Sequence, residues 1–222
     1  MYKKQRGRRE YEQRTEFNLA AWQPKTKLGT LVKEGKITSI EQIFTEGKSI
    51  KETEIIEALL PNLAHMILET ASVQRMTKDT RKRKYRTTAI VGDRNGHIGL
   101  GVGKVIEVRP SIDEAIKNAK KNVISVSLGC GSWECNCKTN HSVPITLHAK
   151  CGTAEITLKP APRGVGIVAG PTAKSVLEFA GIKDVWTFSR GRREDIYNMA
   201  MVTYLALQSL SEIKNAEAIR NQ

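Results

Sequence analysis

Residues 84–108 carry the pattern that most constrains the fold. The stretch "KYRTTAIV" alternates its side chains in the manner of a β-strand, and Asn95-Gly96 is a favoured hairpin turn before the return stretch "HIGLGVGKVIEV". In the return strand one face is apolar, whereas the other consists of Gly99, Gly101 and Gly103. Because glycine weakens a strand, three glycines on one face predict that another backbone or a phosphodiester chain approaches very closely there.

The segments after this hairpin predict an α+β protein. Ser111 and Glu114 are spaced as a capping box at the start of an amphipathic helix. The elements expected next are a hairpin over residues 142–159 turning near Cys151-Gly152, a helix that begins near Pro171 and ends just before Gly181, a strand in "KDVWTFS" and a helix over 195–210. The carboxyl half is therefore expected to be a second small unit with the order ββαβα.

The residues before the first hairpin carry weaker signals. The stretch "TSIEQIFTEG" predicts a short helix capped by Thr38 or Ser39. A second helix is expected over residues 54–69, with a break or kink near Pro61. Residues 1–20 are basic and lack apolar periodicity, so we expect an arm that is disordered until it meets a partner.

The chain is strongly basic. It contains 36 Lys and Arg against 23 Asp and Glu, which gives a formal net charge of +13 and a pI near 9.7. Such an excess favours a polyanionic partner. No apolar run approaches the roughly 20 residues needed to span a bilayer, and no apolar segment follows the charged amino terminus, so neither a membrane protein nor a secreted one is expected. Four cysteines without a signal peptide are typical of a reducing compartment.

The basic residues gather beside the glycine-rich hairpin and in two later segments. Between residues 74 and 86 they outnumber a single acid, Asp79. Basic side chains next to a strand face without side chains would let phosphates approach closely. We therefore predict RNA binding by Arg75, Lys78, Arg81, Lys82, Arg83, Lys84, Arg86, Arg94, Lys104, Arg109, Arg163, Arg190, Arg192 and Arg193.

The stretch "CGSWECNCKTNH" concentrates cysteine in an otherwise cysteine-poor chain. Three thiolates and an imidazole are a complete tetrahedral set for one structural zinc ion, so Cys130, Cys135, Cys137 and His141 are candidate ligands. The spacing lacks paired C-x-x-C knuckles, and Cys151 could replace Cys137 or His141. The alternative is a turn of free thiols with Trp133 packed beneath it. No acid or base nearby indicates a catalytic metal.

Two glycine-rich stretches resemble nucleotide-binding motifs. "GLGVGK" lacks the first glycine and the final Ser or Thr of a phosphate-binding loop. "GVGIVAG" fits G-x-G-x-x-A with Asp184 downstream, but prolines precede it and Asp184 begins a strand, which does not fit a dinucleotide fold. A dinucleotide-dependent enzyme is therefore kept only as an alternative. The histidines lack an activating sequence context, so no catalytic residue is predicted.

Several long stretches resemble the S-five family of small-subunit ribosomal proteins, called S-two in eukaryotes. They are "RTTAIVGDRNGHIGLGVGKVIEVRPSIDEAIKNAKKNVI", "PAPRGVGIVAG" and "AGIKDVWTFSRG", and the resemblance covers nearly all of residues 22–210. "WQPKTKLGTLVKEGKITSIEQIF", "VQRMTKDTRKRKYR" and "CGSWECNC" resemble the archaeal form in particular. A free-standing regulator that binds double-stranded RNA is a further alternative, disfavoured by the carboxyl half.

The resemblance implies a fold, a location and partners. It implies a basic arm and short helical extension over residues 1–72, a module like a double-stranded-RNA-binding domain over 73–128, a Cys-rich connection over 129–141, and an α+β domain over 142–222 with a left-handed βαβ crossover. It places Gly99, Gly101 and Gly103 in an rRNA-binding region. It also implies a non-catalytic protein of the cytoplasmic small ribosomal subunit, in contact with rRNA, neighbouring ribosomal proteins and mRNA near its entry site, with effects on assembly and decoding accuracy.

Overall fold

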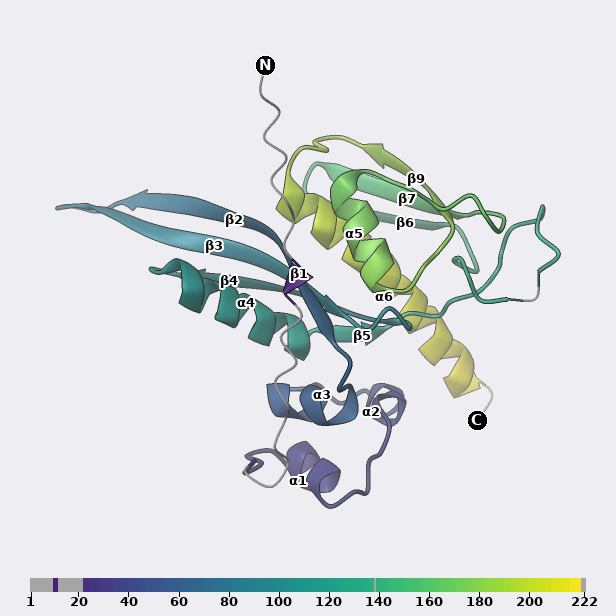
Figure 1. Cartoon of the computed structure of the whole chain (residues 1–222), viewed down its shortest axis with the longest axis horizontal. Helices are drawn as coiled ribbons and strands as arrows, with labels where there is room; N and C mark the ends of the chain where they lie inside the picture. The colour runs from purple at the N-terminus through teal and green to yellow at the C-terminus, as the bar shows by residue number, and fades with distance from the viewer. Residues whose placement is uncertain (1–9, 12–21, 138, 221–222) are drawn as a thin grey trace.

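The structure, a computed structural model, describes residues 10–11, 22–137 and 139–220. The arm predicted over residues 1–20 lies outside the described residues, except for strand β1 (Glu10–Tyr11). In Figure 1 the chain passes from a small helical extension through a first sheet to a second sheet. Within the described part of the chain, no helix is long and apolar enough to cross a membrane.

Three short helices form the extension before the first sheet. They are α1 (Lys27–Lys33), α2 (Ile40–Thr45) and α3 (Thr53–Leu59). Ile43, Ile55 and Ile56 are fully buried in an apolar cluster of their own, with Trp22 at its edge. Ser39 occupies the N-cap position of α2, one of the two positions predicted, but its side chain makes no capping hydrogen bond. The extension is therefore a small packed unit, attached to the first sheet through Val123.

The helix predicted over residues 54–69 is wrong in its second half. Helix α3 ends at Leu59, and Leu60 is already non-helical, with φ −125° and ψ 81°. Pro61 accounts for this end, because proline disfavours the helical conformation of the residue before it. The apolar residues that follow form strand β2 (Ala64–Met76). The domain boundary expected between residues 72 and 73 therefore falls inside strand β2, which begins at Ala64.

The first, amino-terminal sheet is antiparallel and has the strand order β1-β2-β3-β4-β5. Its other strands are β3 (Arg81–Gly92), β4 (His97–Val105) and β5 (Val123–Ser125). The predicted hairpin is confirmed, with residues 93–96 as its turn and Gly96 at φ 103°. Helix α4 (Val108–Lys121) follows β4 and packs against the sheet.

The glycine face of β4 is covered by the backbone of helix α4. A Cβ atom added at Gly101 would overlap backbone atoms of Ala115 and Ala119, and Gly99 and Gly103 meet the same helix. Of the two partners predicted for this face, the structure therefore has a protein backbone. This corrects the assignment of Gly99, Gly101 and Gly103 to an RNA surface, because helix α4 already occupies the space that a nucleic acid would need.

The capping box predicted at the start of α4 is also wrong. The helix begins at Val108 after the N-cap residue Glu107, so Pro110 lies in its first turn, where a missing N–H removes no helical hydrogen bond. Ser111 is instead buried, and its hydroxyl donates to the carbonyl of Tyr85 at 2.9 Å. Glu114 accepts a hydrogen bond from the backbone N–H of Lys104 at 3.1 Å. Both residues therefore fix the helix to the sheet.

The second, carboxyl-terminal sheet has the strand order β6-β7-β9-β8. Its strands are β6 (Leu147–Cys151), β7 (Ala154–Pro160), β8 (Ile167–Val168) and β9 (Val185–Arg190), and its helices are α5 (Pro171–Phe179) and α6 (Ile196–Arg220). The predicted hairpin, both helices and the "KDVWTFS" strand are confirmed. Gly152 and Gly181 adopt positive φ at the predicted turn and after the predicted helix end. Strand β8 was not predicted and pairs in parallel with β9.

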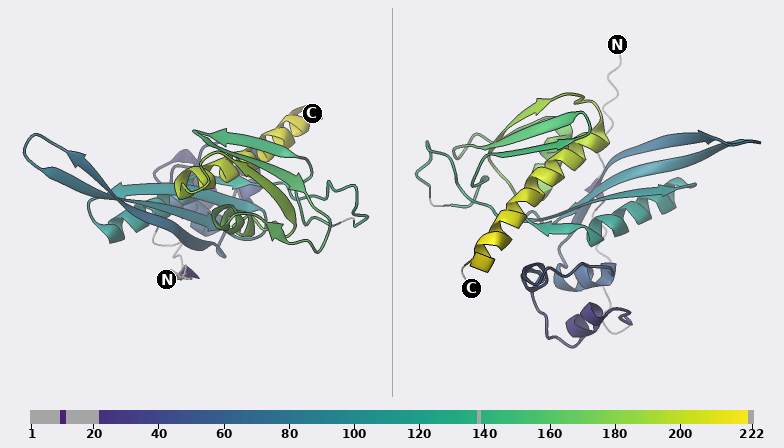
Figure 2. Two further views of the ribbon diagram at one scale, coloured as in Figure 1. Left: turned by 90° about the horizontal axis from the view of Figure 1, so that it is seen from above. Right: turned by 180° about the vertical axis from the view of Figure 1, so that it is seen from behind.

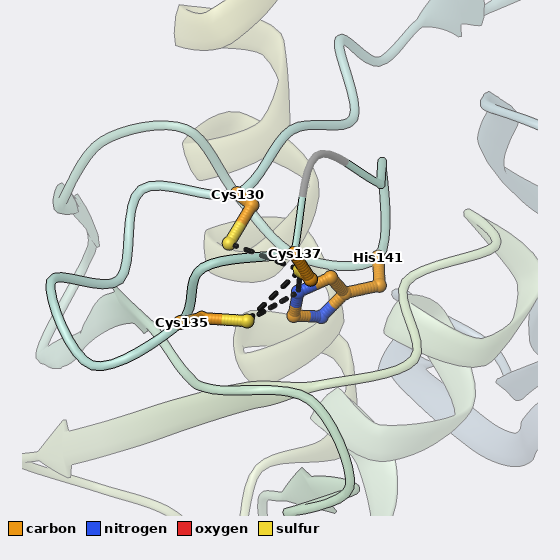
Figure 3. A group of neighbouring side chains, drawn as sticks. All are labelled: Cys130, Cys135, Cys137 and His141. Atoms are coloured by element: carbon orange, nitrogen blue, oxygen red, sulfur yellow. Dashed lines mark hydrogen bonds between the residues drawn. The ribbon is translucent and has the colours of Figure 1, made fainter.

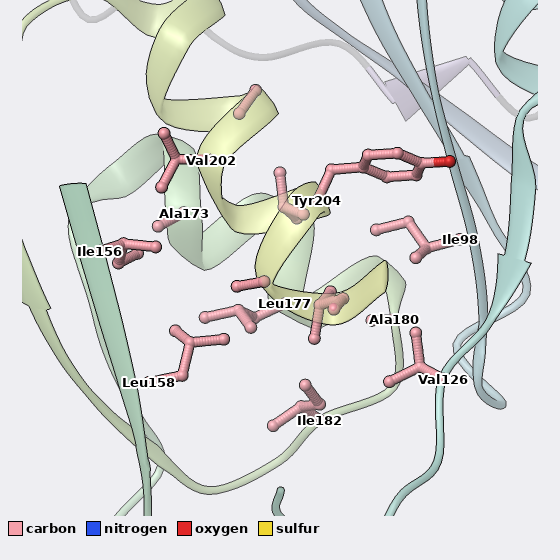
Figure 4. Close-up of a cluster of buried hydrophobic side chains, with 14 of the residues drawn as sticks. Ile98, Val126, Ile156, Leu158, Ala173, Leu177, Ala180, Ile182, Val202 and Tyr204 are labelled. Carbon is pink, nitrogen blue, oxygen red and sulfur yellow. The ribbon is translucent and has the colours of Figure 1, made fainter. Parts of the chain in front are cut away.

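One apolar core joins the two sheets. Helices α5 and α6 lie between them, and Ile98 from the first sheet belongs to the same cluster as Leu158 and Leu177 (Figure 4). Figure 2 shows the resulting layers from two further sides. The turn after β3 strengthens this contact, because the N–H groups of Arg94 and Gly96 donate to the last carbonyls of α5. The amino- and carboxyl-terminal units are therefore two sheets around a shared helical layer.

Candidate nucleic-acid interface and metal centre

The outer half of the β2–β3 hairpin projects beyond the rest of the molecule (Figure 1). The two strands pair as far as Met76 and Arg81, whereas β4 pairs with β3 only from Tyr85 onward. Among the described residues, no third strand lies beside residues 73–84. The turn closes with a hydrogen bond from the N–H of Thr77 to the carbonyl of Thr80 at 2.9 Å. This part of the hairpin is therefore held together by the backbone hydrogen bonds between β2 and β3.

This projecting hairpin carries a group of exposed basic side chains, which we call the hairpin cations. They are Arg75, Lys78, Arg81, Lys82, Arg83 and Lys84. None of the ion pairs found among the described residues involves them. Because cations without carboxylate partners on a projecting hairpin attract a polyanion, the hairpin is the strongest candidate surface for phosphates.

Two other predicted RNA-binding residues have protein partners. The guanidinium of Arg86 lies 5.2 Å from the ring centroid of Tyr197, and that of Arg94 lies 5.6 Å from the ring centroid of Phe179. Both aromatic rings belong to the carboxyl-terminal half. These arginines therefore contribute to the contact between the two halves of the molecule.

The remaining predicted residues are exposed but do not form one group with the hairpin. Lys104 lies opposite Arg86 on β4, and Arg109 lies in the first turn of α4. Arg190, Arg192 and Arg193 follow one another at the end of β9, and Arg163 lies in a separate loop before β8. The structure thus brings together the hairpin cations and, elsewhere, the three arginines after β9.

The Cys-rich loop brings its four predicted ligands together (Figure 3). Their ligand atoms all lie within 4.8 Å of one another. The Sγ atom of Cys137 lies 2.9 Å from Sγ of Cys135, 3.6 Å from Sγ of Cys130 and 3.0 Å from Nε2 of His141. Tetrahedral zinc with bonds of about 2.0–2.3 Å separates its ligand atoms by about 3.3–3.8 Å. The four ligand atoms are therefore within small side-chain movements of the spacing that tetrahedral zinc requires.

His141 is oriented by Asp184, a partner that sequence reasoning did not assign to it. Both side chains are buried, and Nδ1 of His141 lies 2.8 Å from Oδ2 of Asp184. The other carboxylate oxygen accepts hydrogen bonds from the N–H groups of Gly164 and Gly166, at 3.1 and 2.8 Å. The carboxylate lies on the Nδ1 side of the ring, so Nε2 faces the thiols, 3.0 Å from Sγ of Cys137, where it can bind a metal. Metal-binding histidines are commonly oriented by a carboxylate in this way.

The same contacts explain the "GVGIVAG" stretch. Its first two glycines have positive φ angles and aim their N–H groups at Asp184, so the loop binds a protein carboxylate. The dinucleotide interpretation of this stretch is therefore wrong. The spacing between these glycines and Asp184 was the signal in the sequence. It reflects a direct contact between the glycine N–H groups and the Asp184 carboxylate, and not a shared dinucleotide ligand.

The loop can form a thiolate at its centre. Hydrogen bonds from Cys135 and Thr139 lower the pKa of the Cys137 thiol to about 6, and the thiolate is the form that binds metals. Cys151 lies at the end of β6 and packs against the core, outside this group. Trp133 is 92% exposed, which corrects the expectation that it packs beneath the turn.

The fold and the two sites define a strongly basic α+β protein with a projecting cationic hairpin and a closed Cys3His loop. Residues 63–127 match the amino-terminal domain of ribosomal protein S5, and residues 149–220 match its carboxyl-terminal domain. The chain therefore belongs to the ribosomal protein S5 family. Membership makes it a structural component of the small ribosomal subunit, and the alternatives of a dinucleotide-dependent enzyme and a free-standing regulator are set aside.

Archaeal relatives resemble the chain over most of its length. The small ribosomal subunit protein uS5 of Methanocaldococcus jannaschii is 51% identical over 201 residues, which cover 90% of this chain and 93% of the relative. The protein of the same name from Aeropyrum pernix is 51% identical over 194 residues, covering 87% and 89%. That of Methanothermobacter thermautotrophicus is 47% identical over 201 residues, covering 90% and 93%.

Proposed function

We propose that the chain binds rRNA in the small ribosomal subunit chiefly through the hairpin cations, and that it supports subunit assembly, mRNA entry and decoding accuracy in the cytoplasm. The single observation that carries the RNA contact is the projecting β2–β3 hairpin, whose cations have no carboxylate partner among the described residues. Exposed cations release counterions when they meet phosphates, so binding should weaken as salt rises. Lys104, Arg109, Arg163, Arg190, Arg192 and Arg193 would add contacts, with neighbouring ribosomal proteins and mRNA as further partners.

The test compares two charge reversals in the full chain. Lys82→Glu with Lys84→Glu alters the hairpin, and Lys36→Glu with Lys48→Glu makes the same charge change on the helical extension, where both lysines are exposed. We expect the hairpin variant to sediment largely outside small subunits and to reduce the slope of log affinity against log salt by about 0.7–0.9 for each lost phosphate contact. Equal incorporation of the two variants would contradict the proposal.

We also propose that the Cys3His loop binds one structural zinc ion. Cys130, Cys135, Cys137 and His141 would hold it as thiolates and an imidazole, and Asp184 would orient the imidazole. The ion would fix a loop whose ends are joined by the backbone bridge between Gly129 and Ser142.

Metal analysis of the purified full chain tests the zinc site. We expect about one equivalent of zinc, lost in Cys135→Ser and kept in the matched variant Cys151→Ser, because Cys151 lies outside the group. Zinc below a tenth of an equivalent, with all four thiols freely titratable in the native protein, would show that the loop is only a turn.

Two finer features of the fold belong to the same proposal. The β2–β3–β4–α4 order supports a module like a double-stranded-RNA-binding domain in the amino-terminal unit. The parallel β8–α5–β9 unit is the candidate for the left-handed crossover implied by the family. An experimental structure of the chain on its subunit would test both, through the contact between the hairpin and an RNA duplex and the hand of the β8–α5–β9 connection.

A further inference from the structure

The carboxyl-terminal sheet has an open outer face. Helices α5 and α6 cover its inner face, and no described helix or strand lies over the other side (Figures 1 and 2). On β7, Ile156 and Leu158 are buried in the core, so Thr157 between them points outward. Phe188 of β9 lies directly opposite Thr157 and shares its face, because side chains paired across an antiparallel ladder point the same way.

Two aromatic side chains occupy this outer face. Phe188 is 57% exposed, although large aromatic rings usually contribute to cores or interfaces. Trp186 is two residues earlier on β9 and therefore lies on the same face, partly buried. Strand β9 is central in the sheet, between β7 and β8. The aromatic rings thus lie in the middle of the face.

Basic groups surround the aromatic rings. A hollow of about 660 Å³ lies over the face. Among the described residues that line it, Glu155 is the one acid, and its carboxylate is paired with Lys150 at 2.6 Å. The other charged or basic residues that line the hollow are His148, Lys159, Arg190 and Arg193. The face therefore combines an exposed ring with uncompensated positive charge.

We propose that this face binds unpaired RNA nucleotides, with a base stacked on Phe188 and the flanking phosphates held by Lys159, Arg190 and Arg193. A four-stranded sheet that exposes aromatic rings between cations suits single strands, because unpaired bases can turn their faces to a ring. Paired bases are stacked inside a duplex and cannot do so. The positive charge favours a phosphodiester over an apolar protein surface. The proposal is independent of duplex binding by the β2–β3 hairpin.

Lys159 is already placed for such a complex. Its ammonium lies 4.9 Å from the centroid of the Phe188 ring and is exposed. An exposed cation–π contact is weak, and the long side chain can move from the ring to a phosphate as a base arrives. The lysine therefore does not block the site.

The test measures binding of the full chain to a fluorescent single strand of about ten adenosines, within the site sizes of stacking sheets, and to a duplex of equal length. Measurements at elevated salt suppress the purely electrostatic contribution. We expect Phe188→Ala to weaken single-strand binding by about tenfold and to leave duplex binding unchanged. Phe188→Tyr, which keeps an aromatic ring, should bind the single strand as the unmodified chain does. Trp133→Ala, which removes another exposed aromatic ring, is the matched control and should change neither affinity.

The outcomes separate this inference from the proposal for the hairpin. The double variant Lys82→Glu with Lys84→Glu should bind the duplex more weakly. In that background, Phe188→Ala should still weaken binding of the single strand. Equal single-strand affinity in Phe188→Ala and the unmodified chain would overturn the inference. If Phe188→Ala also entered subunits poorly while binding the single strand normally, the face would contact a protein, and the RNA inference would again be overturned.

Discussion

The two sheets differ in what covers them. The amino-terminal sheet lies between α4 on its glycine face and the α5–α6 layer on its apolar face, where Ile98 and Leu100 join the core. The carboxyl-terminal sheet contacts helices on one face and presents Phe188 and Thr157 on the other. Strand β4 of the first sheet is therefore constrained on both faces, whereas the second sheet has one face free to carry binding residues.

This difference sets the kind of side chain that each sheet can use. On β4 the helix approaches so closely that a single Cβ atom would collide with its backbone. On β9 alternate positions accept a ring or a long basic side chain, because no described helix or strand covers them. Substitutions should accordingly have large effects on stability on the glycine face of β4 and small ones on the outer face of the second sheet.

The largest expected effect is at Gly101. Gly101→Ser places a Cβ atom against the backbone of Ala115 and Ala119, which cannot move aside as a side chain can. We expect a loss of about 3 kcal/mol or more in the free energy of unfolding, measured by urea denaturation. Gly170→Ser is the matched control, because nothing lies within 4 Å of its Cβ position and serine suits the N-cap of α5. Similar losses in both variants would contradict the close packing of α4.

The sequence predicted β3 and β4 of the first sheet and β6, β7 and β9 of the second. Alternation predicted β3 and β4, and glycines predicted the ends at Gly152 and Gly181, because these signals act over a few residues. The pattern on β4 also indicated a close approach but not its partner, since the helix and an RNA chain both require a face without side chains. Strand β2 was missed because its apolar residues fit a helix as well as a strand, and pairing with β3 decided between them.

A second effect is expected at Asp184, which immediately precedes β9. Asp184→Asn keeps one oxygen for the N–H groups of Gly164 and Gly166 but removes the charge beside His141. We expect zinc affinity to fall by about 10- to 100-fold, measured by competition with a chelator. Glu178→Gln, which makes the same chemical change on the exposed side of α5, should leave the affinity unchanged. If Asp184→Asn and the unmodified chain bound zinc with equal affinity, Asp184 would not orient His141.

The candidate metal site shows where sequence reasoning ends. The four ligands lie within one short stretch, so their chemistry is visible without a structure. Asp184 comes much later in the chain, and only the fold brings it to His141. The exposure of the Phe188 ring also depends on the fold. The strand was predicted, but which of its faces is buried depends on where α5 and α6 pack.

A smaller, pH-dependent effect is expected at the turn of the β3–β4 hairpin, whose N–H groups bind the end of α5. Burial raises the pKa of Asp93, but hydrogen bonds from His97 and from the N–H of Asn95 outweigh it and lower the pKa below its ordinary value of 3.8. The folded state therefore favours the carboxylate, and the stabilisation is present above about pH 3.8 and lost as the pH falls through the folded-state pKa.

The variant Asp93→Asn tests this turn. It should be less stable than the unmodified chain by about 1–2 kcal/mol near neutral pH, because it loses charged hydrogen bonds. The difference should shrink as the pH falls below about 3.8. Urea midpoints of both chains over the same pH series provide the measurement. A constant difference across the series would assign the effect to packing.

The smallest expected effect is on the open face of the carboxyl-terminal sheet. Phe188→Thr removes a ring that is 57% exposed and leaves a residue suited to a strand, so the free energy of unfolding should change by no more than about 0.5 kcal/mol. Leu158→Ala, on the buried face of the neighbouring strand, should cost about 2–5 kcal/mol. A loss in Phe188→Thr as large as that in Leu158→Ala would mean that the ring is packed in the free chain, and that the two sheets are covered alike.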